Sequence, residues 1–191
     1  MELYSKDDLN SALSTLTEGG VILYPTDTIW GLGCDATRSE PVERIFRIKK
    51  RIEKKSLIIL VNSFAMLERY VGDVPEMASQ IIEVSDRPMT IIYPRGKNLA
   101  PGVCGEDGSV GVRICTDGFC NELITRFRRP VISTSSNYSD EPAPLVFSQI
   151  NGAIISEVDY VVKYRQNDEE KHSPSSIIKF ENDGSLKIIR Q

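Results

Sequence analysis

Short apolar runs alternate along the chain with polar stretches that contain glycine and proline. The runs Val21–Tyr24 and Leu57–Val61 are unbroken by polar residues, which is typical of strands buried on both faces. Similar runs predict further strands at 90–93, 110–114, 131–133 and 160–162. Near the C-terminus, the runs 176–180 and 186–190 flank Asn182-Asp183-Gly184, a turn signal that predicts a hairpin.

Apolar residues near helical spacing, with capping residues before them, predict helices between these strands. Ser5 followed by Asp8 resembles a capping box, and Gly19-Gly20 ends that helix. Further helices are predicted at about 39–50, 63–71, from Pro75, after Asp117 and just before 160. Strands and helices therefore alternate, and the closing hairpin favours a mixed sheet. We predict an α/β fold with an open, twisted mixed sheet and flanking helices, in one domain spanning 1–191.

Composition narrows the class of protein. The 191 residues are 40% hydrophobic, enough for a real core, which excludes a disordered chain. The net charge of −4 argues against a general nucleic-acid coat protein. No apolar run is long enough to span a membrane, and the acidic, polar start is unlike a signal peptide, so we expect a cytoplasmic protein with no membrane partner.

The sequence offers little for metal or triad chemistry. Its four cysteines form no Cys-x-x-Cys pair and its single histidine is His172, so no metal site is predicted and the thiols are expected to be reduced and mostly buried. A Ser–His–Asp triad cannot be inferred from one histidine, and His172 is expected to be structural or merely exposed. Neither a phosphate loop nor a dinucleotide fingerprint is present.

Three polar stretches lie where an α/β sheet places its ligands. In the first, 25–33, the hydroxyls of Thr26 and Thr28 beside a carboxylate suit an amino acid's polar groups; the alternative is a turn bonded to its own backbone. In the second, 44–55, seven of twelve residues are basic. Such a cluster suits a polyphosphate, or else it complements a helix dipole. Lys49 and Arg51 converge on one ligand only if the helix ends between them.

The third stretch, 131–137, carries hydroxyls and an amide that suit a nucleotide's phosphates or sugar, unless it is simply a hydroxyl-rich loop. Arg113 lies inside the apolar run 110–114, and a charge there needs a carboxylate partner, either structural or from a ligand. Positioned cations and hydroxyls without an obvious base favour phosphoryl or nucleotidyl transfer.

Together these stretches resemble the YrdC-like family of threonylcarbamoyl-AMP synthases, in its short, single-domain bacterial form. The resemblance covers about Glu18 to Arg190, with Arg113 after Gly-Val and Thr90 after Pro-Met. It rests on four motifs in order: Pro25-Thr26-Asp27-Thr28-Ile29-Trp30-Gly31-Leu32, Lys49-Lys50-Arg51, Ser135-Ser136-Asn137 and Pro174-Ser175-Ser176. Ile52 and Ser56 stand where the family generally has prolines, a change at the loop under the triphosphate.

The resemblance implies a concave basic cavity and a reaction in which L-threonine, bicarbonate and ATP, with Mg²⁺, give threonylcarbamoyl-AMP and pyrophosphate. The product would serve downstream proteins that modify tRNA. Carried over by motif, the ATP-binding residues would be Lys49, Arg51, Thr90, Ser135, Asn137 and Arg190, with Lys49 and Arg51 also catalytic. The threonine-binding residues would be Thr26 or Thr28, Arg113, Ser133 and Ser175.

Two further expectations follow from the sequence. Lys49 is treated as an exposed side chain, so that its removal should depress ATP use and spare stability. The alternative function is a family member that binds double-stranded RNA or tRNA without synthase activity, through the basic run and Arg126, Arg128 and Arg129. The acidic total and the lack of aromatic residues spaced for base stacking weigh against it.

Overall fold

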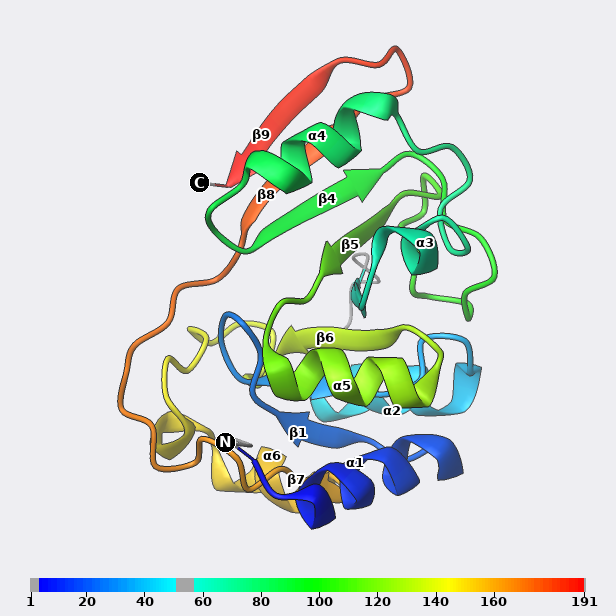
Figure 1. Ribbon diagram of the computed structural model, residues 1–191. Coiled ribbons are helices and arrows are strands. Elements are labelled where there is room, and N and C mark those ends of the chain that lie inside the picture. The colour runs from blue at the N-terminus through cyan, green and yellow to red at the C-terminus, as the bar shows by residue number, and fades with distance from the viewer. Residues whose placement is uncertain (1–3, 51–56, 191) are drawn as a thin grey trace.

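Nine strands form one mixed sheet in the computed structural model, which describes residues 4–50 and 57–190 (Figure 1). Their order across the sheet is β7-β1-β2-β6-β3-β5-β4-β8-β9. The pairs β1–β7, β3–β5 and β4–β8 are parallel and the other neighbours antiparallel, which confirms the predicted mixed sheet. The strands are β1 (Ile22–Tyr24), β2 (Gly31–Gly33), β3 (Ile58–Val61), β4 (Met89–Tyr93), β5 (Val110–Ile114), β6 (Val131–Ser135), β7 (Tyr160–Val161), β8 (Ser176–Phe180) and β9 (Leu186–Arg190).

Helices flank this sheet. In Figure 1, α4 lies over the β4–β8–β9 end, while α5 and α1 lie together over the end that holds β6 and β1, and α2 is seen behind β6. The helices are α1 (Lys6–Glu18), α2 (Ser39–Ile48), α3 (Phe64–Leu67), α4 (Glu76–Val84), α5 (Gly118–Phe127) and α6 (Gly152–Glu157), with a 3₁₀ turn η1 at Phe147–Gln149. None of the helices within the described ranges is long and apolar enough to cross a membrane.

The ends of the first helix show both a confirmed and a wrong prediction. Ser5 caps α1 by accepting from the Asp7 N–H, and Gly19 ends it at φ 86°, a left-handed conformation that suits glycine. Asp8, however, is not the second half of a capping box. Its buried carboxylate accepts from the Tyr160 hydroxyl at 2.7 Å and from the backbone N–H groups of Lys163 and Tyr164, so it fastens α1 to β7 and the chain beyond it.

Strand boundaries differ from the sequence prediction in the polar stretches. Gly31–Gly33, expected to be part of a polar loop, forms β2 and pairs with both β1 and β6. A Cβ atom at Gly33 would lie 2.5 Å from the Tyr24 ring, so this narrow crossing requires glycine. β6 runs on to Ser135, which places Ser133 and Ser135 on the strand itself. The predicted helix 63–71 is only the short α3.

One long connection joins the two ends of the sheet. After β7 the chain runs along the side of the molecule to reach β8 near the opposite end of the strand order (Figure 1, orange). We call residues 163–175 the strap. It carries Pro174 and Ser175 to the middle of the molecule, where they face the cavity described next.

Candidate functional site

A cavity of about 600 Å³ opens between the middle strands, the end of α2 and the end of the strap. Among the described residues, four basic side chains and one carboxylate contribute to its lining. The residues around it are Thr28, Ile29, Trp30, Gly31, Lys49, Lys50, Leu57, Ile58, Arg113, Ser133, Thr134, Ser135, Asn137, Ser139, Asp140, Ala143, Pro174, Ser175 and Arg190. Stretches far apart in the sequence therefore meet in one hollow of a size suited to small-molecule binding.

Most of the predicted site residues are brought together here. Eight of them line the cavity: Thr28, Lys49, Arg113, Ser133, Ser135, Asn137, Ser175 and Arg190. Thr26 and Thr90 lie one layer behind it, bonded to residues that do line it. Arg51, and the departures at Ile52 and Ser56, lie outside the described residues.

The first polar stretch is both a self-bonded turn and a cavity wall. The buried Thr26 hydroxyl donates to the Ile29 carbonyl at 2.9 Å and accepts from the Thr28 N–H at 3.0 Å. Its oxygen also lies 3.0 Å from the Thr28 hydroxyl. Thr28 lines the cavity, so Thr28 is placed to meet a ligand and Thr26 to hold Thr28.

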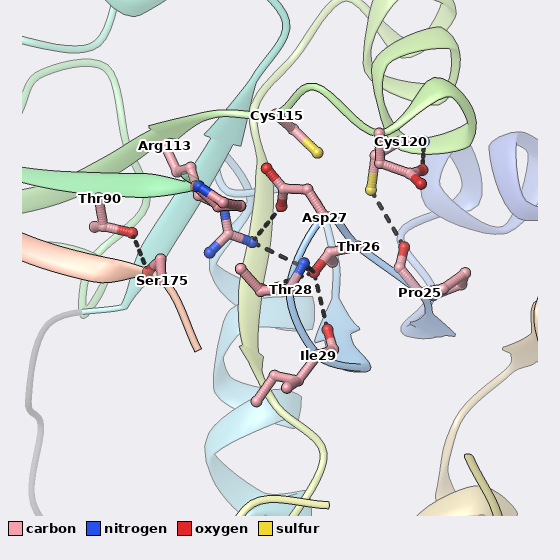
Figure 2. A network of polar contacts seen from close by, with 12 residues as sticks. Pro25, Thr26, Asp27, Thr28, Ile29, Thr90, Arg113, Cys115, Cys120 and Ser175 are labelled. Atoms are coloured by element: carbon pink, nitrogen blue, oxygen red, sulfur yellow. Dashed lines mark hydrogen bonds and ion pairs between the residues drawn. The ribbon is translucent and has the colours of Figure 1, made fainter. Parts of the chain in front are cut away.

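Arg113 forms the charged end of the cavity. Its guanidinium is 4% exposed and its Nη2 lies 3.1 Å from Oδ1 of the equally buried Asp27, with a longer contact to the Thr26 hydroxyl (Figure 2). Apart from this ion pair, the Arg113 Nε and both Asp27 oxygens have no hydrogen-bond partner among the described residues. The carboxylate partner that the sequence required for Arg113 is therefore the structural Asp27. The Arg113 guanidinium keeps donors for a second anion.

Hydroxyls and a second guanidinium extend this end. The Thr90 and Ser175 hydroxyls, both buried, lie 2.8 Å apart. Arg190, at the end of β9, donates from Nε to the Ser175 carbonyl at 2.9 Å. Its partial burial, and then the nearby charge of Arg113, lower the pKa of Arg190. Two cations that share one cavity favour an anion between them.

Lys49 lies at the other end of the cavity along the strand direction. Arg113 pairs with Leu60 of β3, whereas Lys49 contacts residues 135 and 137, which follow Ser133, the partner of Ile58. α2 ends at Ile48, Lys49 is its C-cap and Lys50 adopts φ 49°. The helix therefore does not continue past Lys49, and the convergence of Lys49 with Arg51 stays a prediction. The Lys49 ammonium donates to the backbone carbonyls of Ser135 and Asn137. The side chain is only 3% exposed, so the expectation of an exposed lysine is wrong, and that exposure no longer supports the prediction that its loss would spare stability.

The third polar stretch supplies an oriented amide. The Asn137 side-chain amide donates to the carbonyls of Tyr138 and Glu141. These two bonds leave Oδ1, which is buried and has no hydrogen-bond partner within the described ranges, as an acceptor at the cavity wall. Ser136 is turned away and donates to the Trp30 carbonyl at 3.1 Å, which ties β6 to the start of β2.

Three other basic residues of the sequence analysis have acidic partners outside the cavity. Arg44 pairs with Asp159, Arg126 with Glu122 and Arg129 with Asp35. These surface charges are compensated locally, which does not favour a phosphate-tracking RNA surface. Cys34, Cys115 and Cys120 are buried as expected, and burial raises the pKa of the Cys34 and Cys120 thiols.

Two functional features were not foreseen. Asp27 stood in a quoted motif, yet nothing in the spacing identified it as the partner of Arg113; the signal available was the buried arginine itself. Arg165 was not singled out at all. It lies on the strap, and its guanidinium donates to the Thr26 carbonyl at 3.0 Å, behind the wall that carries Thr28.

Comparison with known proteins places the chain in a family. The family model Sua5_yciO_yrdC, described as "Telomere recombination", matches residues 14–191. The chain is 35% identical over 152 residues to the threonylcarbamoyl-AMP synthase of Psychromonas ingrahamii, covering 78% of this chain and 80% of that protein.

Solved structures share the fold. P. abyssi Sua5 complexed with L-threonine superposes with a TM-score of 0.79 at 25% identity, over 90% of this chain and 50% of that one. The chain thus spans about half the length of that relative. E. coli YciO superposes with a TM-score of 0.84 over 98% of this chain and 90% of its own, at 21% identity, and supports the fold alone.

Proposed function

The chain belongs to the Sua5/YciO/YrdC family, and we propose that it is a threonylcarbamoyl-AMP synthase, a nucleotidyltransferase that acts on L-threonine, bicarbonate and ATP. The observation that carries the proposal is the cavity itself: Arg113, fixed by Asp27, lies at one end and Lys49, fixed by two carbonyls, at the other. A pair of substrates, one with a carboxylate and the other with a polyphosphate, matches this arrangement of charge.

At the threonine end, Arg113 pairs with the substrate carboxylate, because a guanidinium offers several donors in a fixed plane and only some of them are used by Asp27 and Thr26. The hydroxyls of Thr28, Ser133 and Ser175 are the polar groups around it. Thr90 acts by holding Ser175. Arg190 lies between this group and the nucleotide, since it bonds Ser175 and lines the same cavity.

The reaction then needs positions and charge rather than a protein nucleophile. The threonine amine and bicarbonate form a carbamate with loss of water. A carbamate oxygen attacks the α-phosphorus of ATP, forming a P–O bond as the bond to pyrophosphate breaks. Lys49, with Arg51 by resemblance, offsets the charge that develops on pyrophosphate, and such charge neutralisation is most of what phosphoryl-transfer sites do.

ATP enters with Mg²⁺ as part of the substrate. Magnesium prefers oxygen ligands and usually keeps water and substrate phosphates around it. The cavity offers few protein oxygens of that kind: the free Oδ1 of Asn137 and the carboxylate of Asp140. These fit an ion held chiefly by the triphosphate, and Ser135 and Asn137 then contact the nucleotide.

The experiment is a pyrophosphate-release assay with ATP, Mg²⁺ and bicarbonate, with and without L-threonine, read together with mass spectrometry for the carbamoyl adenylate. Threonine-dependent pyrophosphate and the adenylate are expected, with serine as the specificity control. A folded protein that releases no pyrophosphate would overturn the proposal. We further propose a cytoplasmic setting in which the product passes to tRNA-modifying proteins; transfer of labelled threonine to tRNA by a reconstituted mixture tests that step.

A further inference from the structure

Arg165 is the most connected side chain of the strap. It adopts φ 64°, unusual for a residue with a Cβ, and its side chain is 18% exposed. Its Nε donates to Asp168 at 2.9 Å, its Nη2 contacts the His172 ring, and its Nη1 donates to the Thr26 carbonyl and lies 3.8 Å from Asp117. The guanidinium plane therefore joins the strap, the cap of α5 and the Thr26–Thr28 turn.

The bond to Thr26 is the one that reaches the site. Thr26 supports Thr28 through two contacts and touches the guanidinium of Arg113 with its hydroxyl. The position of its peptide thus sets both the hydroxyl and the cation that face threonine. A charge-assisted hydrogen bond from a half-buried arginine is among the stronger ways to fix a carbonyl.

Asp168 and His172 hold the guanidinium from the strap side. Together with Glu170 they form a cluster of groups that resembles a cation site, with ligand atoms within 4.8 Å of one another. The Arg165 guanidinium already contacts two of the three, and a second cation beside it would be repelled. The cluster is therefore explained as the support of Arg165, which also gives His172 the structural role expected from the sequence.

We propose that Arg165 is a positioning residue for the amino-acid end of the cavity: it fixes the Thr26–Thr28 turn from behind and makes threonine binding depend on the strap. The inference takes its substrate, threonine, from the proposed function. The positioning role itself rests only on the contacts of Arg165. The same strap carries Ser175 into the cavity. Arg165, near the start of the strap, thus lies behind the part of the cavity wall that carries Thr28, and Ser175, at the end of the strap, lines the cavity itself.

The test compares Arg165→Met and Arg165→Lys with Arg126→Met, a matched control whose arginine pairs with Glu122 on the α5 surface. One readout is amide hydrogen exchange of a peptide spanning 25–33, measured without substrates. The other is the KM for threonine against the KM for ATP. For Arg165→Met we expect faster exchange in this peptide and a threonine KM raised about tenfold, the factor for one lost hydrogen bond to a charged group. The ATP KM should change less than about twofold.

Arg165→Lys keeps the charge and one of the bonds, so it should recover part of both effects, while Arg126→Met should change neither. If Arg165→Met does not fold, Asp168→Asn loosens the same guanidinium from outside and should shift both readouts in the same direction. Unchanged exchange in 25–33, or equal rises in both KM values, would overturn the positioning role. An inactive wild-type protein would overturn the proposed function instead, and the exchange measurement would still decide the role of Arg165.

Discussion

The two ends of the cavity fix their cations in different ways. Arg113 is held by side chains: the Asp27 carboxylate and the Thr26 hydroxyl. Lys49 donates to main-chain carbonyls at 135 and 137. A support made of side chains can be removed by one substitution, whereas a carbonyl stays whatever residue carries it. The proposed threonine end should therefore be fragile toward mutation of its surroundings, and the proposed nucleotide end should be sensitive to Lys49 itself and to the path of β6.

The largest effect is expected from Arg113→Gln. It removes the proposed partner of the threonine carboxylate and leaves Asp27 buried without a counter-ion, which costs about 3–5 kcal/mol of folding free energy. The threonine KM should rise at least about thirtyfold, since a lost buried charge contact is worth more than about 2 kcal/mol. Urea unfolding and steady-state kinetics measure the two quantities.

A double-mutant cycle with Asp27→Asn separates stability from binding. Because the double variant has no buried charge at this place, it should regain much of the stability that Arg113→Gln loses while its threonine KM stays high. A double variant as unstable as the single one would show that the pair is not the source of the cost.

At the nucleotide end, Lys49→Met should raise the ATP KM more than the threonine KM. The lost donor also leaves two buried carbonyls short of a partner, so we expect the free energy of unfolding to fall by about 1–3 kcal/mol. Lys50→Met is the control for stability, because Lys50 is exposed and lies over the Tyr138 ring at 4.1 Å. Equal stability of the Lys49 and Lys50 variants would contradict the burial of Lys49.

Thr90→Val and Ser175→Ala distinguish contact with the ligand from support of it. Ser175 lines the cavity and Thr90 only bonds Ser175. The threonine KM should therefore rise more in Ser175→Ala than in Thr90→Val, and the stability loss should be about 1 kcal/mol in each. The reverse order in kinetic measurements would place Thr90 at the ligand.

The smallest effect concerns Asp117, which caps α5 near Asp27 and Arg165. Burial raises the pKa of Asp117, and the charge of Asp27 adds to the rise. Since the folded state holds the proton more tightly, the wild type loses stability as the pH climbs from the ordinary aspartate value of about 3.9 through the raised one. Asp117→Asn keeps the cap and removes that loss, so it should gain up to about 1 kcal/mol at pH 7 and nothing at pH 3 in thermal unfolding.

Much of the fold was predictable because buried strands and capped helices leave local signals. The strand at 110–114 and the hairpin at 176–190 could be predicted from their own residues alone. The N-terminal ends of α1 and α5 could be predicted from the capping residues Ser5 and Asp117. β2 was missed because a strand of Gly-Leu-Gly has almost no β propensity. It forms because its neighbours β1 and β6 leave room for a glycine backbone and little else.

The sequence indicated most of the residues that surround the cavity, but not which side chains line it and which lie behind the lining. Hydroxyls and cations at strand ends marked the right stretches, since such groups are unusual beside buried runs. Whether Thr26 or Thr28 faces the cavity, and whether Lys49 is exposed, depends on contacts with segments more than eighty residues away. Arg165 gave no signal because an arginine in a polar, charged stretch is ordinary until its partners are known.

The order in which strands are added to the sheet has a consequence for folding. β1 pairs with β7, and β4 with β8, so each pairing waits for chain synthesised long after its partner. Such non-local contacts slow folding, because the entropy of closing a long loop is spent before the contact forms. Until β8 docks, the edge of β4 is open and Thr90 lacks Ser175. During translation at roughly 5–20 residues per second, this protein therefore passes several seconds as a partial sheet that cannot bind substrate, and chaperone dependence should be concentrated in that interval.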